Sequence, residues 1–157
     1  IDDLLASTDL GLQSVLVHFL RERSATSNYA SRIGGTNFTR AEFNRVHALG
    51  IEAEAELLRD FFGDPTIRIV NDSPSPTIRR VFRNSRGDLI RRRVTLGRGA
   101  ERGVDSMSID VRTRAGVTHT AEEYRRILEE ERIAQQVARE RLGGARPAPV
   151  RARGAAA

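Results

Sequence analysis

The three histidines are the side chains best suited to chemistry near neutral pH, because imidazole changes charge there and is also the commonest metal ligand. His18 and Glu22 are four residues apart, and His47 and Glu54 are seven apart. On a helix, both spacings place the two side chains on the same side. If the two segments form helices that pack antiparallel, all four side chains converge and provide ligands of the type that hold a metal ion.

The segment 15–22 resembles, in part, the helix that carries the His-Glu-x-x-His motif of zincin peptidases. It differs at two positions, because Phe19 stands in place of the catalytic glutamate and Glu22 in place of the second histidine. A degenerate or atypical metallohydrolase that uses the two histidine–glutamate pairs is therefore one hypothesis. The alternative is that His18 pairs with Glu22 on the flank of a helix, while His47 lies at the edge of the core.

The third histidine, His119, directly precedes a helix start and lies close in sequence to arginines and to a tyrosine. A metal-independent ribonuclease needs an acid–base pair and a cation that stabilises the pentacovalent phosphate. His119, Tyr124 and either Arg112 or Arg114 supply parts of such a set. A toxin-like nuclease is therefore a second enzyme hypothesis, and the alternative interpretation of His119 is a turn histidine at a helix entrance.

Positive charge is concentrated in one part of the chain. All 26 basic residues are arginines, so the chain is lysine-free. Residues 66–102 hold 10 arginines against 3 acidic residues, whereas residues 1–65 hold 6 arginines against 10 acidic residues. Because 66–102 has the period of β-strands, the excess charge is expected on a sheet.

Alternate residues of a strand share one face of the sheet, so Arg91 and Arg93 are expected on the same face. Other strand arginines are candidates for the same basic surface, namely Arg68, Arg79, Arg83 and Arg112. Our leading hypothesis is a binding domain whose arginine-rich sheet engages a polyanion, either nucleic acid or the acidic surface of a protein. The alternative is that glutamates of the helices neutralise these arginines within the chain.

Composition excludes several classes of site. Without cysteine there is no disulfide framework, no zinc–thiolate site and no cysteine nucleophile. No run approaches the ~18 apolar residues needed to span a bilayer, so we expect a soluble protein. The chain begins at Ile1, which predicts a fragment or a processed form of a longer protein. We expect a bacterial protein, with an effector or toxin domain as one interpretation. The cofactor, and the choice between bacterial cytoplasm and secretion, stay open.

Two helices are predicted in the first part of the chain, over residues 9–23 and 40–62. The second has the clearer signals, because Thr39 and Glu42 form a capping box, Gly63 provides a stop and Pro65 forbids continuation. Another capping box, Thr120 with Glu123, predicts a long helix over residues 121–142.

Between the helices, apolar residues recur with a period of two. This period predicts strands over 66–70, 77–83 and 88–96, with a turn at 84–87, and a final strand after a glycine-rich loop at 97–103. Residues 145–157 contain only Pro, Ala, Arg, Gly and one Val, and are predicted to be disordered. The expected fold is therefore one α+β domain over 1–144, with two N-terminal helices, a small antiparallel sheet of about four strands and a C-terminal helix.

Overall fold

The computed structural model of the chain describes residues 9–26, 39–72, 74–96 and 104–143. The predicted loop at 97–103 and the predicted tail at 145–157 lie outside these ranges, as do residues 27–38. The chain separates into two compact units, residues 1–125 and residues 126–157.

The described residues form three helices and one five-stranded antiparallel sheet, so the predicted α+β class is confirmed. No helix among them is long and apolar enough to cross a membrane. In chain order the elements are α2 (Leu10–Ser24), α4 (Arg40–Phe62), β1 (Arg68–Asp72), β2 (Ile78–Arg83), β3 (Leu89–Leu96), β4 (Val104–Arg112), β5 (Thr118–Thr120) and α5 (Ala121–Gly143).

The helix ends follow from local capping. Thr39 Oγ1 accepts a hydrogen bond from the backbone N–H of Glu42 at 3.1 Å, and Gly63 ends α4 in the left-handed conformation with φ of 60°. At α5 the capping box is complete, because Thr120 and Glu123 each donate a backbone N–H to the other's side chain, at 3.0 and 3.2 Å. The predicted bounds 40–62 are therefore confirmed, and α5 ends one residue beyond the prediction.

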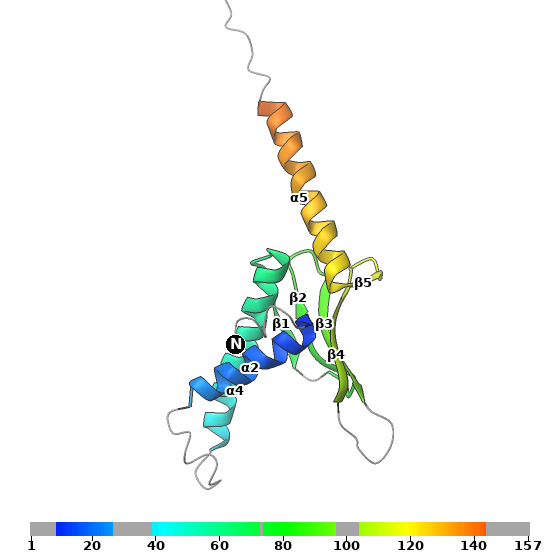
Figure 1. Cartoon of the computed structure of the whole chain (residues 1–157). Coiled ribbons are helices and arrows are strands. Elements are labelled where there is room, and N and C mark those ends of the chain that lie inside the picture. The colour runs from blue at the N-terminus through cyan, green and yellow to red at the C-terminus, as the bar shows by residue number, and fades with distance from the viewer. Residues whose placement is uncertain (1–8, 27–38, 73, 97–103, 144–157) are drawn as a thin grey trace, which may run out of the picture. The chain divides into compact units, whose positions relative to one another are not determined.

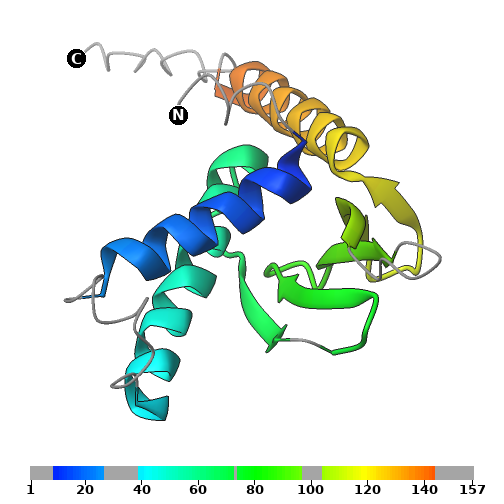
Figure 2. The same cartoon turned by 60° about the horizontal axis from the view of Figure 1, so that its bottom comes forward.

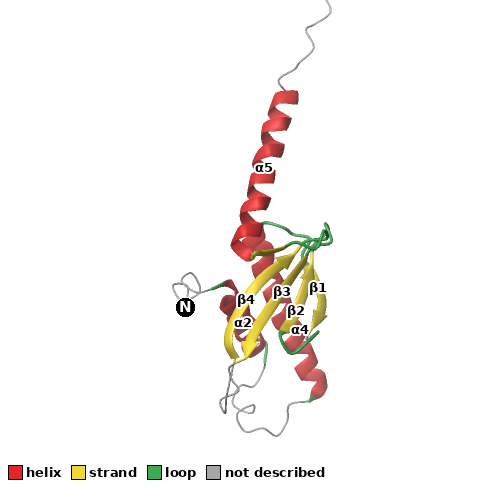
Figure 3. Cartoon of the chain, turned by 90° about the vertical axis from the view of Figure 1, so that its right-hand side faces the viewer, coloured by secondary structure: helices red, strands yellow, loops and turns green. Residues whose placement is uncertain are grey.

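The sheet is a simple meander in which each strand pairs with the next, in the order β1-β2-β3-β4-β5 (Figure 3). The three-residue strand β5 was not predicted, because so short a segment shows no recognisable period. A tight turn creates it: Gly116 has φ of 88°, and Thr113 N–H donates to Val117 O, which brings the chain back along β4.

Helices α2 and α4 lie on the same face of the sheet (Figures 1 and 3), and α2 crosses α4 (Figure 2). The core lies between these layers, where α4 contributes the fully buried Leu58 and Phe62, and the strands contribute Phe82, Ile90 and Val111. Strand residues on the helix side of the sheet can therefore contact side chains of α2 and α4.

Phe62→Ala tests this packing. Phe62 is fully buried and its ring meets that of Tyr124 edge-on, with 5.5 Å between centroids. We expect the substitution to lower the free energy of unfolding by ~3–5 kcal/mol, because it opens a cavity that the core cannot fill. Phe61 is only half-buried, so Phe61→Ala should cost less. Urea denaturation of both variants measures the difference, and equal losses would show that the end of α4 packs differently.

Candidate metal site

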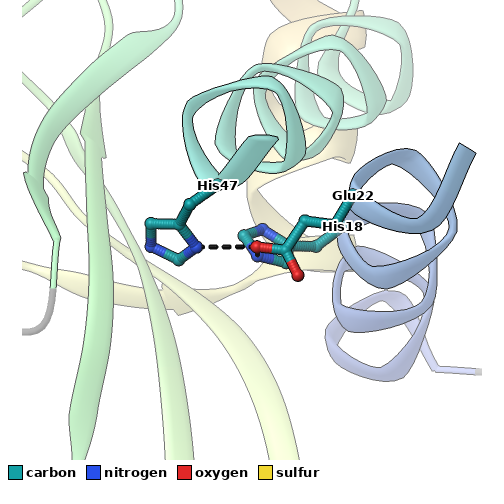
Figure 4. Close-up of side chains that lie close together, drawn as sticks. All are labelled: His18, Glu22 and His47. Carbon is teal, nitrogen blue, oxygen red and sulfur yellow. Dashed lines mark hydrogen bonds and ion pairs between the residues drawn. The ribbon is translucent and has the colours of Figure 1, made fainter. Parts of the chain in front are cut away.

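Two histidines and one glutamate meet where α2 crosses α4 (Figure 4). Oε1 of Glu22 lies 2.9 Å from Nε2 of His18 and 2.8 Å from Nδ1 of His47. Each of the three residues offers one ligand atom, and these atoms lie within 4.8 Å of one another. Because α2 supplies His18 and Glu22 while α4 supplies His47, only the crossing of the helices assembles the group.

Two histidines and a carboxylate form a typical ligand set of catalytic zinc sites, in which a fourth position stays open. Ligand atoms around a tetrahedral zinc ion with bonds of ~2.0–2.1 Å lie about 3.3 Å apart. The two nitrogens are 2.8 and 2.9 Å from the Glu22 oxygen, and all three atoms lie within 4.8 Å of one another, so one ion can reach all three after the side chains adjust.

The far side of each imidazole also faces a carboxylate. Nδ1 of His18 lies 2.7 Å from Oε1 of Glu54, and Nε2 of His47 lies 3.1 Å from Oδ2 of Asp72. Histidines that bind metals usually donate their second ring N–H to such an acceptor, which sets the tautomer and the ring orientation. Nε2 of His47 forms a hydrogen bond with Asp72, whereas Nδ1 of His18 is close to Glu54 without the geometry of a hydrogen bond. In the tautomer that carries each proton on this far nitrogen, the near nitrogens present lone pairs toward Glu22. Three acceptor atoms then face one another, an arrangement that requires a cation or protons between them.

Glu54 was predicted as a fourth ligand, and the structure places it behind His18 instead. Its carboxylate is 0% exposed and also lies 2.6 Å from Nε of Arg80 and 3.7 Å from Nη1 of Arg92. The physical reason is the rise of the helix, because seven residues advance ~10 Å along α4 from His47. Glu54 therefore lies at one edge of the His18 ring, and Glu22 lies at the opposite edge.

Arg80 and Asp72 were missed by the sequence reasoning. Arg80 on β2 is buried, and its guanidinium pairs with both Glu54 and Asp72. It therefore connects the two carboxylates that lie on the far sides of the imidazoles. The strand predicted over 66–70 ended before Asp72, but β1 extends to this residue and pairs it with Arg80. The only signal in the sequence was that Asp72 is one of few acidic residues in the arginine-rich segment.

The register divides the strand arginines between the two faces of the sheet. Arg80 and Arg92 are directly opposite each other and point toward the helices. A register shift next to Ile78 turns Arg79 toward the same side, where it lines a pocket beside the histidines. The opposite face, which we call the outer face, carries Arg68, Arg83, Arg91, Arg93 and Arg112.

Two arginines of the outer face share one acidic partner. Nε of Arg91 lies 2.6 Å from Oδ1 of Asp110, and Nε of Arg93 lies 2.5 Å from Oδ2 of the same carboxylate. Arg91 and Arg93 thus share a face, as expected, but part of their charge is neutralised by the neighbouring strand β4. Of the six arginines considered for polyanion binding, the outer face holds five, and only Arg79 lies elsewhere.

The residues of the nuclease hypothesis are not brought together. His119 is opposite Val111, whereas the adjacent Arg112 is opposite Thr118, so the two side chains point to different faces. The Tyr124 hydroxyl is buried and donates to Asp88 at 2.5 Å, and burial followed by this hydrogen bond raises the tyrosine pKa above its usual range. Tyr124 therefore holds the hairpin turn to α5, and it is poorly suited to transfer protons.

Glu54→Gln tests the role of the buried carboxylate. The amide keeps the shape but removes the negative charge, so Arg80 and Arg92 lose their shared buried counter-charge. We expect the free energy of unfolding to fall by ~3–5 kcal/mol, as for one partner lost from a buried ion pair. The matched control is Glu52→Gln on the same helix, where an exposed pair with Arg59 contributes at most ~1 kcal/mol. Similar losses in urea denaturation would contradict the assignment.

Comparisons of the chain with protein-family models, with curated proteins and with solved structures found no match.

Proposed function

We propose that this domain binds a divalent transition-metal ion, with zinc the best fit, through His18, Glu22 and His47. The observation that carries the proposal is the convergence of three ligand atoms, with a second carboxylate close to the far nitrogen of each imidazole. Magnesium and calcium fit less well, because they prefer sites made of oxygen ligands only. Nitrogen and oxygen ligands together favour zinc and its neighbours in the transition series.

The site favours metal-dependent ligand binding over hydrolysis of the zincin type. Glu22 is occupied as a ligand, and Phe19 stands where a zincin has its catalytic glutamate. The remaining carboxylates near the histidines, Glu54 and Asp72, are paired with arginine. Among the described residues, therefore, no carboxylate at the site is left to take a proton from water, and the fourth metal position is best suited to hold a ligand.

Titration of the chelator-treated protein with zinc tests the proposal. We expect one zinc ion per chain by isothermal titration calorimetry, and a rise in melting temperature, because a ligand that binds only the folded state stabilises it. His47→Ala should weaken zinc binding about tenfold or more, since it removes one of three ligands. His47 is half-exposed, so this variant should still fold.

His119→Ala is the matched control for the zinc titration. Its ring lies 3.9 Å from Glu123 and takes no part in the group of three ligands, so zinc affinity should not change. Binding that is absent in the parent protein, or equally weakened in both variants, would refute the assignment of the site.

A second candidate function is polyanion binding by the outer face of the sheet. The observation that favours it is the local excess of charge, because Arg68 lies directly opposite Arg83 and both are exposed. Like charges in this position repel each other unless an anion lies between them. Neither side chain has an ion-pair partner among the residues that the structure describes.

Arg68→Glu combined with Arg83→Glu tests this second candidate. Folding should be nearly unaffected, because exposed charges contribute ~0–1 kcal/mol to stability. Affinity for RNA should fall, and log affinity should decrease less steeply with log salt, because fewer counterions are released. The control, Arg40→Glu with Arg126→Glu, changes the net charge by the same amount at exposed helix positions. An identical response of the two double variants in a fluorescence-anisotropy titration would exclude the outer face as the site.

A further inference from the structure

A pocket of about 340 Å³ lies beside the proposed metal site, between the two helices and the sheet. The three proposed ligands lie in its wall, together with Arg79, Arg80 and Arg92 from strands β2 and β3. The rest of the wall is apolar and includes Phe19, Phe43, Val94 and Met107. Any molecule that fills the open metal position therefore also meets guanidinium groups and apolar side chains.

Arg92 is a buried cation that is only partly compensated. Its side chain is 9% exposed, its Nη1 lies 3.7 Å from Glu54, and its Nε has no hydrogen-bond partner. Burial, only partly offset by Glu54, lowers the pKa of the guanidinium below its usual value. Arg80, by contrast, pairs with a carboxylate at two of its nitrogens. Because a buried cation without sufficient partners is unfavourable, Arg92 has unused capacity for an anion.

The formal charge around the pocket also favours an anion once a metal is bound. Arg79, Arg80 and Arg92 are balanced by three carboxylates, those of Glu22, Glu54 and Asp72. A divalent ion bound to neutral histidines would add two positive charges to this balance. The pocket then attracts oxyanions, and arginine matches the planar geometry of a carboxylate or of two phosphate oxygens.

Aromatic rings line the metal-site end of the pocket. The side chains of Phe19 and Phe43 are 60% and 45% exposed. The Phe43 ring stacks on His47 with 5.2 Å between centroids, and the Phe19 ring meets His18 edge-on at 5.7 Å. Exposed rings at this position provide an apolar contact for a ligand whose polar end reaches the histidines.

We propose that the pocket binds a small molecule in which an oxyanion head group, carboxylate or phosphate, is joined to an apolar group. The head group pairs with Arg92 and Arg79 and takes the open metal position, and the apolar group contacts Phe19 and Phe43. This inference rests on the proposed metal site, whose ion supplies part of the positive charge.

The test uses calorimetric titration of the zinc-loaded protein with 3-phenylpropionate and with phenylphosphonate. We expect at least one of them to bind at least about tenfold more tightly than either of two controls. Acetate lacks the apolar group, and 3-phenylpropanol lacks the charge. The preferred probe identifies the head group as carboxylate or phosphonate. Binding of neither probe above the level of these two controls would overturn the inference.

Arg92→Met and Arg79→Gln locate the binding within the pocket. Each should weaken the preferred probe about tenfold or more, and Arg40→Gln, at an exposed position of α4, should leave it unchanged. If circular dichroism shows that Arg92→Met does not fold, Arg79→Gln alone carries the test, because Arg79 is only half-buried. Binding that is unchanged in both pocket variants would overturn the inference.

A parallel zinc titration separates this inference from the proposed function. If zinc binds but neither oxyanion does, the oxyanion pocket is wrong and the metal site stands. If zinc does not bind, the metal site is wrong. Oxyanion binding that is equal with and without zinc would overturn the role of the metal in holding the head group.

Discussion

The buried carboxylate of Glu54 is the constraint on which this structure depends. A charge fully withdrawn from water is tolerated only when other groups compensate it closely. Two strands supply that compensation, with Arg80 from β2 and Arg92 from β3, and Nδ1 of His18 from α2 lies 2.7 Å from the same carboxylate. The helix pair and the sheet are therefore held together by charge as well as by apolar contacts. The same contacts set the orientation of the His18 ring that faces Glu22.

Gly50 provides the steric counterpart of this electrostatic constraint. In the sequence it looks like a weak point within a long helix, since glycine lowers helix stability by about 1 kcal/mol relative to alanine. In the structure, a Cβ at this position would lie 2.8 Å from the His18 ring and 3.0 Å from Cγ of Glu22. Glycine thus permits the close crossing of α2 and α4 that brings His18 and Glu22 to His47.

The arginines serve two different roles according to the face of the strand that they occupy. Arg80 and Arg92 compensate the buried Glu54 beneath the helices, and Arg91 and Arg93 share Asp110 on the outer face. Much of the positive charge of the central segment is therefore used within the domain. The net charge counted along the sequence therefore overstates the positive charge that a binding partner can reach. Ion pairs between neighbouring strands cannot be seen in such a count.

Local signals in the sequence determined the class of fold and the limits of its main elements. The capping box at Thr39 and the stop at Gly63 define α4 because they act over a few residues, and the strands follow from their period of two. The histidine–glutamate spacing likewise indicated which side chains share a helix face. Only the tertiary structure decided that Glu54 lies behind His18 and that Asp72 and Arg80 join the site. These contacts depend on where two helices cross and how strands align. The histidine–carboxylate and Arg80–Glu54 contacts join residues 25 or 26 positions apart, and no local pattern encodes packing over that separation.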